Sequence, residues 1–128
     1  DASNSMTYGS QRVNKLDYAR YLAASLAYMA SQQRDAAGLL IFNNDVRNYV
    51  PPSTRQGQLM RILHAIEKAE PGERTDFAKP FRHVQEFLHR RGIVVVFSDF
   101  WERPEAIIET VAPLRYRGNE LVLFHVLD

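Results

Sequence analysis

Short apolar runs alternate along this chain with longer segments of helical periodicity, and this alternation restricts the fold. Residues 37–42 and 93–97 are almost wholly apolar, and residues 119–127 are strongly so, as expected of strands that are buried on both faces. The segments between them carry apolar residues three or four positions apart, which places those residues on one face of a helix. We therefore expect an α/β fold of the Rossmann-like type, with a doubly wound, mostly parallel sheet and helices on both faces.

One part of this sheet is expected to be antiparallel. Asn43-Asn44-Asp45 is a turn signal between the strand at 37–42 and a second strand at 46–50, which predicts a hairpin at the edge of the sheet. Pro51-Pro52 follows directly, and proline cannot donate to a strand ladder. We expect the hairpin to end there.

Capping signals locate the helices. Helix starts are predicted from short polar side chains or an early proline, and the end of the third helix from two basic residues and a glycine. The signals are Asn14 for a first helix, Ser53 or Thr54 for a second, Arg90-Arg91 with Gly92 for the end of a third, and Pro104 for a fourth.

Composition excludes several classes of function. With 16 basic and 15 acidic residues the net charge is +1, so we expect contact with neither nucleic acid nor an acidic membrane. The chain has no cysteine, which excludes disulfides and thiolate metal sites and fits a cytoplasmic location. No stretch approaches the ~20 apolar residues that span a bilayer. A length of 128 residues suits a single domain, residues 1–128.

Hydroxyl and carboxylate side chains occur where strands are expected to end. Asp1, Ser3 and Ser5 alternate at the start of the chain, and the strand at 93–97 runs into Ser98-Asp99. Thr75 offers a further hydroxyl in the loop before the third helix. Oxygen ligands of this kind suit a hard octahedral ion such as Mg²⁺.

This order of residues resembles the metal-ion-dependent adhesion site of von Willebrand factor type A domains, which reads Asp-x-Ser-x-Ser, then a distant Thr and a distant Asp. Asp1, Ser3, Ser5, Thr75 and Asp99 fill these positions in order. Residues 15–20, 38–42, 50–53 and 97–100 are similar to the bacterial family called domain of unknown function 58, and the resemblance covers the whole chain. The chain departs from the Thr-Asp-Gly of many type A domains, because Phe100 stands in place of the glycine.

The resemblance implies a metal-dependent binding module and not an enzyme. The five motif residues would hold Mg²⁺, with Mn²⁺ and Ca²⁺ as alternatives, and an open position on the ion would accept a carboxylate from a protein partner. It further implies a relationship with MoxR-type AAA+ ATPases. Side chains expected to form the rim of the partner site are Tyr8, Arg12, Arg74, Phe100, Trp101 and Arg103. For Phe100 and Trp101, packing over the following helix is the alternative.

Two other functions stay open. Asp1 at a strand end resembles the nucleophile of haloacid-dehalogenase-type phosphatases, which carry a second carboxylate two residues later. Here that position is Ser3, which removes the general acid. The remaining alternative is a structural module whose metal motif is unused.

The start of the chain leads to an expectation about its sheet. In the family's strand order, a strand ending at Asp1 lies between the strands at 37–42 and 93–97. No residues precede Asp1 in this sequence. We therefore expect the chain to be a piece of a longer protein, with its first and central strand outside it.

Overall fold

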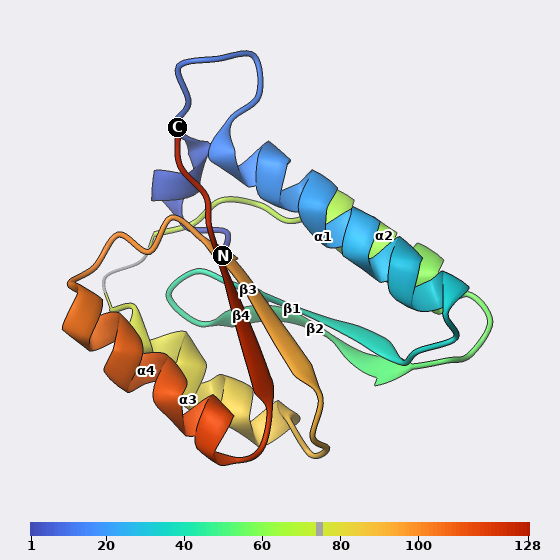
Figure 1. The fold of residues 1–128 in the computed structure, drawn as a ribbon. Coiled ribbons are helices and arrows are strands. Elements are labelled where there is room, and N and C mark those ends of the chain that lie inside the picture. The colour runs from blue at the N-terminus through green and yellow to red at the C-terminus, as the bar shows by residue number, and fades with distance from the viewer. Residues whose placement is uncertain (74–75) are drawn as a thin grey trace.

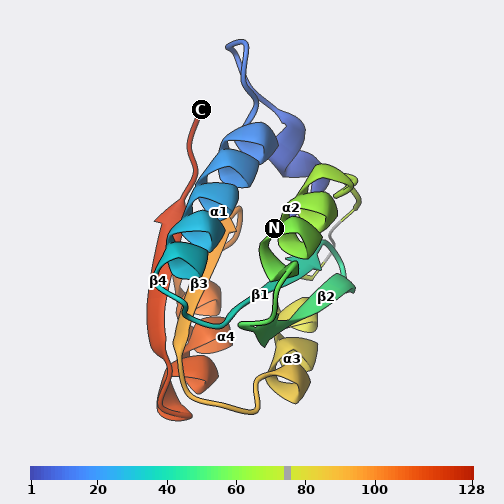
Figure 2. The ribbon, with the colours of Figure 1, turned by 90° about the vertical axis from the view of Figure 1, so that its right-hand side faces the viewer.

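The fold consists of α helices packed on both sides of short strands (Figures 1 and 2). The computed structural model describes residues 1–73 and 76–128. The elements are the 3-10 turn η1 (Asn4–Thr7), α1 (Lys15–Gln32), β1 (Ala37–Phe42), β2 (Val46–Ser53), α2 (Gln58–Glu67), α3 (Ala78–Phe87), β3 (Ile93–Ser98), α4 (Pro104–Tyr116) and β4 (Glu120–His125). This order confirms the α/β class. Within the described residues, no helix is long and apolar enough to cross a membrane.

The described strands pair in two separate sheets, which differs from the single doubly wound sheet that we expected. β1 and β2 are antiparallel, with Leu40 opposite Tyr49. β3 and β4 are parallel, with Val95 opposite Val122, and α4 provides the crossover that a parallel pair requires. The hairpin is therefore confirmed, whereas the assembly of all strands into one mostly parallel sheet stays a prediction.

The start of the chain lies between these two sheets. The backbone nitrogen of Asp1 donates to the carbonyl of Phe97 in β3, 3.0 Å away. The nitrogen of Ala2 donates to the carbonyl of Phe42, the last residue of β1, 2.6 Å away. Two successive residues thus connect β3 to β1. They bring the Asp1–Ser5 motif to the carboxyl ends of both strands.

Each pair of helices covers one side of the strands and has its own core. α1 and α2 lie on one side, and α3 and α4 on the other (Figure 1). The first core includes Met6, Leu16 and Ile62, and the second includes Phe81 and Leu114. Leu114 is 0% exposed, and full burial of a side chain of this size stabilises the fold by roughly 1.5–3 kcal/mol. The apolar stripes of the sequence thus become two cores on opposite sides of the strands.

The capping signals are confirmed for two helices and wrong for the other two. The Asn14 side chain accepts a hydrogen bond from the nitrogen of Asp17 at 2.8 Å and so caps α1, and Pro104 is the first residue of α4. α3 ends at Phe87, so Arg90-Arg91 lies beyond the helix and not in its last turn. The predicted start of α2 is also wrong, because the preceding strand is longer than expected.

We expected the hairpin to stop at Pro51-Pro52, but β2 continues through both prolines to Ser53. A register shift near Ala37 places Ser53 opposite Ala37, and such irregularities admit proline into a strand. The side-chain amide of Gln58 then donates to the carbonyls of Ala37 and Pro51 at 2.7 and 2.8 Å. Ser53 therefore belongs to the strand, and neither it nor Thr54 caps α2, which starts at Gln58.

Candidate functional site

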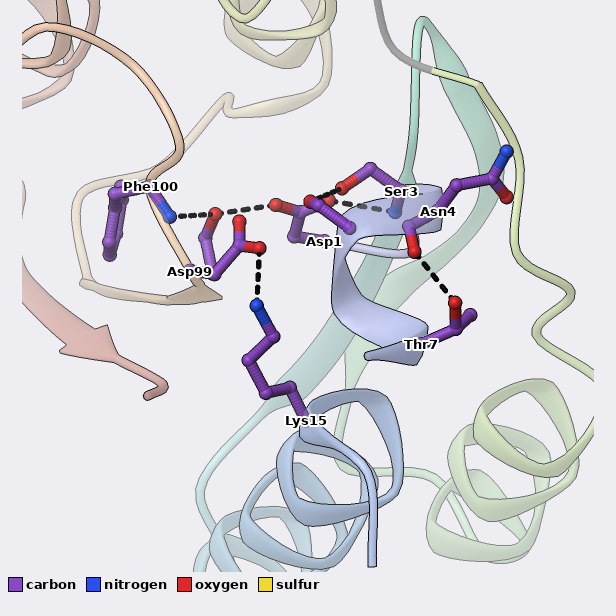
Figure 3. A network of polar contacts seen from close by, with 9 residues as sticks. Asp1, Ser3, Asn4, Thr7, Lys15, Asp99 and Phe100 are labelled. Atoms are coloured by element: carbon purple, nitrogen blue, oxygen red, sulfur yellow. Dashed lines mark hydrogen bonds and ion pairs between the residues drawn. The ribbon is translucent and has the colours of Figure 1, made fainter. Parts of the chain in front are cut away.

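The Asp1–Ser5 motif folds into a tight turn. The nitrogen of Ser3 donates to Asp1 Oδ1 at 2.9 Å, and the turn η1 brings Ser5 Oγ to 3.0 Å from Ser3 Oγ. Ser3 is only 2% exposed although its side chain is polar. Figure 3 shows the carboxylate of Asp1 next to Ser3 in this turn. Residues at alternate positions of the sequence thus turn their oxygens toward one another.

The end of β3 supplies the other half of the site. Ser98 is completely buried, and its hydroxyl donates to Asp1 Oδ2 and accepts from the nitrogen of Phe100, 2.9 Å away. The next residue along the chain, Asp99, is 5% exposed. Asp1, Ser3, Ser5 and Asp99 therefore lie at the same end of the strands, with Asp1 between Ser3 and Asp99 (Figure 3).

Thr75 and Arg74 lie outside the described residues, but the segment before them runs beside the motif. The nitrogen of Asn4 donates to the carbonyl of Gly72 at 2.8 Å, and the nitrogen of Gly72 donates to the carbonyl of Ala2 at 2.9 Å. A Cβ atom at Gly72 would lie 2.2 Å from Asn43 Nδ2, so any larger residue there would have to displace the buried Asn43 side chain.

Sequence reasoning missed Lys15, which reaches the site from the first turn of α1. Its Nζ atom lies 2.9 Å from Asp99 Oδ2 (Figure 3). The two side chains are 13% and 2% exposed, so the ion pair is shielded from water. The first turn of α1 already carries the acidic Asp17, which is favoured at the positive end of the helix dipole. The local sequence therefore gave no signal that Lys15 pairs with Asp99.

The turn after Asp99 buries one aromatic side chain and exposes the next. Phe100 has φ 46°, in the left-handed region that costs a residue with a side chain about 1–2 kcal/mol. Its ring packs against Phe77 and His125, with centroids 6.0 and 5.9 Å apart, and the residue is 8% exposed. This packing buries most of the ring, as in the alternative named for Phe100, but the residue still lines a cavity beside Asp99, so its place on the rim stays a prediction. Trp101, in contrast, is 80% exposed.

Two open cavities meet at Trp101 and Glu102, which line both. The smaller, of about 310 Å³, is lined by Ser3, Asn4, Ser5, Glu73, Phe77, Trp101 and Glu102. The larger, of about 830 Å³, is lined by Lys15, Asp99, Phe100, Trp101, Glu102, Arg103, His125, Leu127 and Asp128. Of the expected rim residues, Phe100, Trp101 and Arg103 thus line the larger cavity, whereas Tyr8 and Arg12 are exposed in the loop before α1, outside these two linings.

Asp128 holds that loop at the edge of the larger cavity. Its Oδ1 and Oδ2 atoms accept from the nitrogen of Ser10 at 3.0 and 2.9 Å, and Oδ1 also accepts from the Ser10 hydroxyl at 2.9 Å. These hydrogen bonds, the backbone ones first, lower the pKa of Asp128 below 3.8, and the positive charge of Lys15 adds to the effect. Lys15 therefore lies in the field of two carboxylates, those of Asp99 and Asp128.

The candidate ligand atoms of the site are oxygens. Within residues 1–73 and 76–128, no group of three or more His, Cys, Asp or Glu side chains could hold a metal ion. The side chains that gather are instead two carboxylates, Asp1 and Asp99, and two hydroxyls, Ser3 and Ser5. Mg²⁺ is typically held by one or two carboxylates and keeps several waters, whereas Zn²⁺ favours nitrogen and sulfur. These residues fit magnesium better than zinc.

Comparison with known proteins identifies relatives without an assigned activity. Residues 1–126 match the model of a family described as protein of unknown function DUF58. The chain is 32% identical over 136 residues to an uncharacterised protein of Mycobacterium bovis and to one of Mycobacterium tuberculosis. These alignments cover 100% of the chain and 41% of each relative. The chain therefore spans less than half the length of the curated relatives that it matches.

Proposed function

Because the chain belongs to the DUF58 family of unknown function, we propose its role from the chemistry of the site. In this proposal the domain is a von Willebrand factor A-like binding module, in which Mg²⁺ bridges to a carboxylate of a partner protein. The observation that carries the proposal is the gathering of Asp1, Ser3, Ser5 and Asp99 at one end of the strands, where Ser3 and Ser5 line one open cavity and Asp99 lines the other (Figure 3).

Asp1, Ser3, Ser5 and Asp99 would hold the ion, together with Thr75 in the proposed ligand set. The ion would supply an electrophilic centre with an exchangeable position for an outside oxygen ligand. The chain itself holds the Asp1 carboxylate in place, because Ser3 donates to one of its oxygens and Ser98 to the other. Ligands that are fixed in this way lose little conformational freedom on binding.

The charges around the site favour an acidic partner only when a cation is present. The described residues that line the two cavities include four acidic side chains, Glu73, Asp99, Glu102 and Asp128, and two basic ones, Lys15 and Arg103. A partner carboxylate would be repelled by this excess of negative charge. A bound divalent cation would cancel this excess of two negative charges and offer a ligand position to the partner carboxylate. Metal dependence of binding follows from this cancellation.

The exposed Trp101 gives the partner an anchor next to the metal ligands. Tryptophan is enriched among the residues that carry most of the binding energy in protein interfaces. At 80% exposure, Trp101 has most of its surface available for burial by a partner. The family resemblance suggests a MoxR-type AAA+ ATPase as that partner.

Phosphoryl transfer by Asp1 is the weaker candidate. A haloacid-dehalogenase-type site carries a second carboxylate two residues after the nucleophile, which serves as the general acid. Ser3 stands at that position here. Without this acid, the site favours a role of Asp1 as a metal ligand over a role as a nucleophile.

Manganese binding to the full-length protein tests the proposal. Mn²⁺ takes the same oxygen ligands as Mg²⁺, and the electron paramagnetic resonance signal of free Mn²⁺ reports how much is bound. We expect the protein to reduce this signal, excess Mg²⁺ to restore it, and the Ser5→Ala, Thr75→Ala and Asp99→Asn variants to bind about ten-fold more weakly or worse. A wild-type protein that leaves the signal unchanged would contradict the metal site and favour an unused motif.

Capture of the partner tests the second half of the proposal. Immobilised full-length protein should retain a MoxR-type ATPase from the same organism in Mg²⁺ and release it in EDTA. The Ser5→Ala variant is the matched control. It removes one proposed metal ligand, and it should keep the fold because Ser5 is only half-buried. Retention that is equal in Mg²⁺ and EDTA would show that the metal does not bridge the partners.

A further inference from the structure

We propose that Lys15 competes with the metal ion for Asp99, so that the domain alternates between a lysine-paired and a metal-bound state. The inference rests on the proposed function and adds a regulatory residue to the same site. It starts from the contact between Lys15 Nζ and Asp99 Oδ2, 2.9 Å apart.

The ion pair places the ammonium group where a cation bound to Asp99 would meet it. Figure 3 shows Lys15 extending from α1 to Asp99, in the same group of side chains as Asp1 and Ser3. The Asp99 side chain is 2% exposed and that of Lys15 is 13% exposed, so water screens the pair poorly. Two cations at one shielded carboxylate repel each other strongly. A metal ion that binds Asp99 directly must therefore displace the ammonium group.

Lys15 has both the flexibility and the room to leave. Its charge sits at the end of four methylene groups, and it lines the cavity of about 830 Å³ next to Asp99. Asp128 lines the same cavity, and the charge of Lys15 already acts on it. The displaced ammonium group thus finds a second carboxylate within the same cavity.

The pairing has a consequence for the domain without metal. A buried carboxylate that lacks a compensating charge destabilises a fold, and Lys15 supplies that charge to Asp99. The domain therefore needs no metal ion to keep its fold. The same contact raises the concentration of metal that the site requires.

Manganese titration of the full-length protein tests the competition. We expect Lys15→Gln to bind Mn²⁺ about ten-fold more tightly than the wild type. Lys15→Arg keeps the positive charge and should show no gain. The matched control is Lys68→Gln, which removes one positive charge from the exposed end of α2. In an Asp99→Asn background, Lys15→Gln should give no gain, because there is no carboxylate left to compete for.

A second measurement needs no variant of Lys15. Brief acetylation of the wild-type full-length protein, followed by mass spectrometry, reports how accessible each lysine is. Saturating Mg²⁺ should increase the acetylation of Lys15 several-fold and leave that of Lys68 unchanged. This readout remains decisive if Lys15→Gln fails to fold.

The outcomes separate the inference from the function on which it rests. If neither the wild type nor Lys15→Gln binds Mn²⁺, the proposed metal site is wrong and the competition falls with it. If the wild type binds and Lys15→Gln binds equally or more weakly, the metal site stands and only the competition is overturned. Acetylation of Lys15 that saturating Mg²⁺ leaves unchanged also overturns the competition.

Discussion

The hydroxyl of Ser98 donates a hydrogen bond to the carboxylate of Asp1, which lies 97 positions away in the sequence. The same hydroxyl accepts from the nitrogen of Phe100 at 2.9 Å and so defines the turn around Asp99. Ser98 is 0% exposed, which shields both bonds from solvent. A single buried hydroxyl thereby positions both halves of the candidate site.

Replacing Ser98 by alanine should weaken metal binding through Asp1 without removing a proposed ligand. We expect Ser98→Ala to bind Mn²⁺ about ten-fold more weakly, and to lose about 1–3 kcal/mol of stability because the nitrogen of Phe100 loses its acceptor. Electron paramagnetic resonance and urea unfolding measure the two effects. Ser25→Ala is the control, since Ser25 is an exposed serine of α1 that donates to the carbonyl of Tyr21. Unchanged metal affinity in Ser98→Ala would limit Ser98 to a structural role.

Trp101 should matter for binding and hardly at all for folding. Because it is 80% exposed, Trp101→Ala should change stability by no more than about 0.5 kcal/mol. If it anchors the partner, the same change should weaken the complex by about 2 kcal/mol or more. Tyr116→Ala is the control, since Tyr116 is 87% exposed at the last position of α4. Calorimetry with the captured partner decides, and equal affinities of the two variants would remove Trp101 from the interface.

The left-handed backbone of Phe100 predicts that glycine at this position gives a more stable protein than alanine, which is the reverse of the usual order. Both Phe100→Ala and Phe100→Gly lose the ring contacts with Phe77 and His125, and we expect each to lower stability by about 2–5 kcal/mol. Glycine adopts φ 46° freely and alanine does not, so Phe100→Gly should be the more stable variant by about 1 kcal/mol. Urea unfolding of both variants measures the difference. If alanine is the more stable of the two, the left-handed conformation does not persist in solution.

Acid should weaken the contact between the β1–β2 turn and α3. Asp45 Oδ1 lies 2.5 Å from His83 Nδ1, and this hydrogen bond is the largest cause that lowers the pKa of Asp45 below 3.8. A carboxylate with a lowered folded pKa contributes stability above its unfolded pKa and loses it as pH falls through the folded value. Wild type and Asp45→Asn should therefore differ in thermal stability above the unfolded pKa and converge only as the pH falls below 3.8, through the lowered folded pKa. Melting curves from neutral to acid pH check this, and a constant difference would contradict it.

The order of the elements and the β1–β2 hairpin could be predicted from the sequence, whereas the full length of β2 and the arrangement of the two sheets could not. The apolar runs at 37–42 and 93–97 were sufficient to predict β1 and β3, because a buried strand needs little beyond local apolar character. The extension of β2 across Pro51-Pro52 depends on a register shift opposite Ala37, which is a long-range property. For the same reason, local pattern could not decide whether the two sheets join.

The candidate site shows the same division between local and long-range information. The resemblance to the adhesion-site motif selects Asp1, Ser3, Ser5 and Asp99 as candidate oxygen ligands. The contact of Ser98 with Asp1 joins residues that are 97 positions apart, and that of Lys15 with Asp99 joins residues that are 84 positions apart. Local sequence patterns could predict neither contact. The family resemblance identified candidate ligands but gave no information on the hydrogen bonds and ion pairs that position them.

Asp128 provides the last prediction, because it lies on the path proposed for Lys15. If Asp128 receives the displaced ammonium group, Asp128→Asn should weaken Mn²⁺ binding of the wild type several-fold and have little effect in the Lys15→Gln background. Asp128→Asn also disturbs the bonds to Ser10, so Ser10→Ala, which removes only the hydroxyl bond, serves as the control and should bind metal normally. Electron paramagnetic resonance of the single and double variants measures the coupling between the two sites. An equal loss in both backgrounds would mean that Asp128 acts on the metal through its charge alone, and that Lys15 does not move to it.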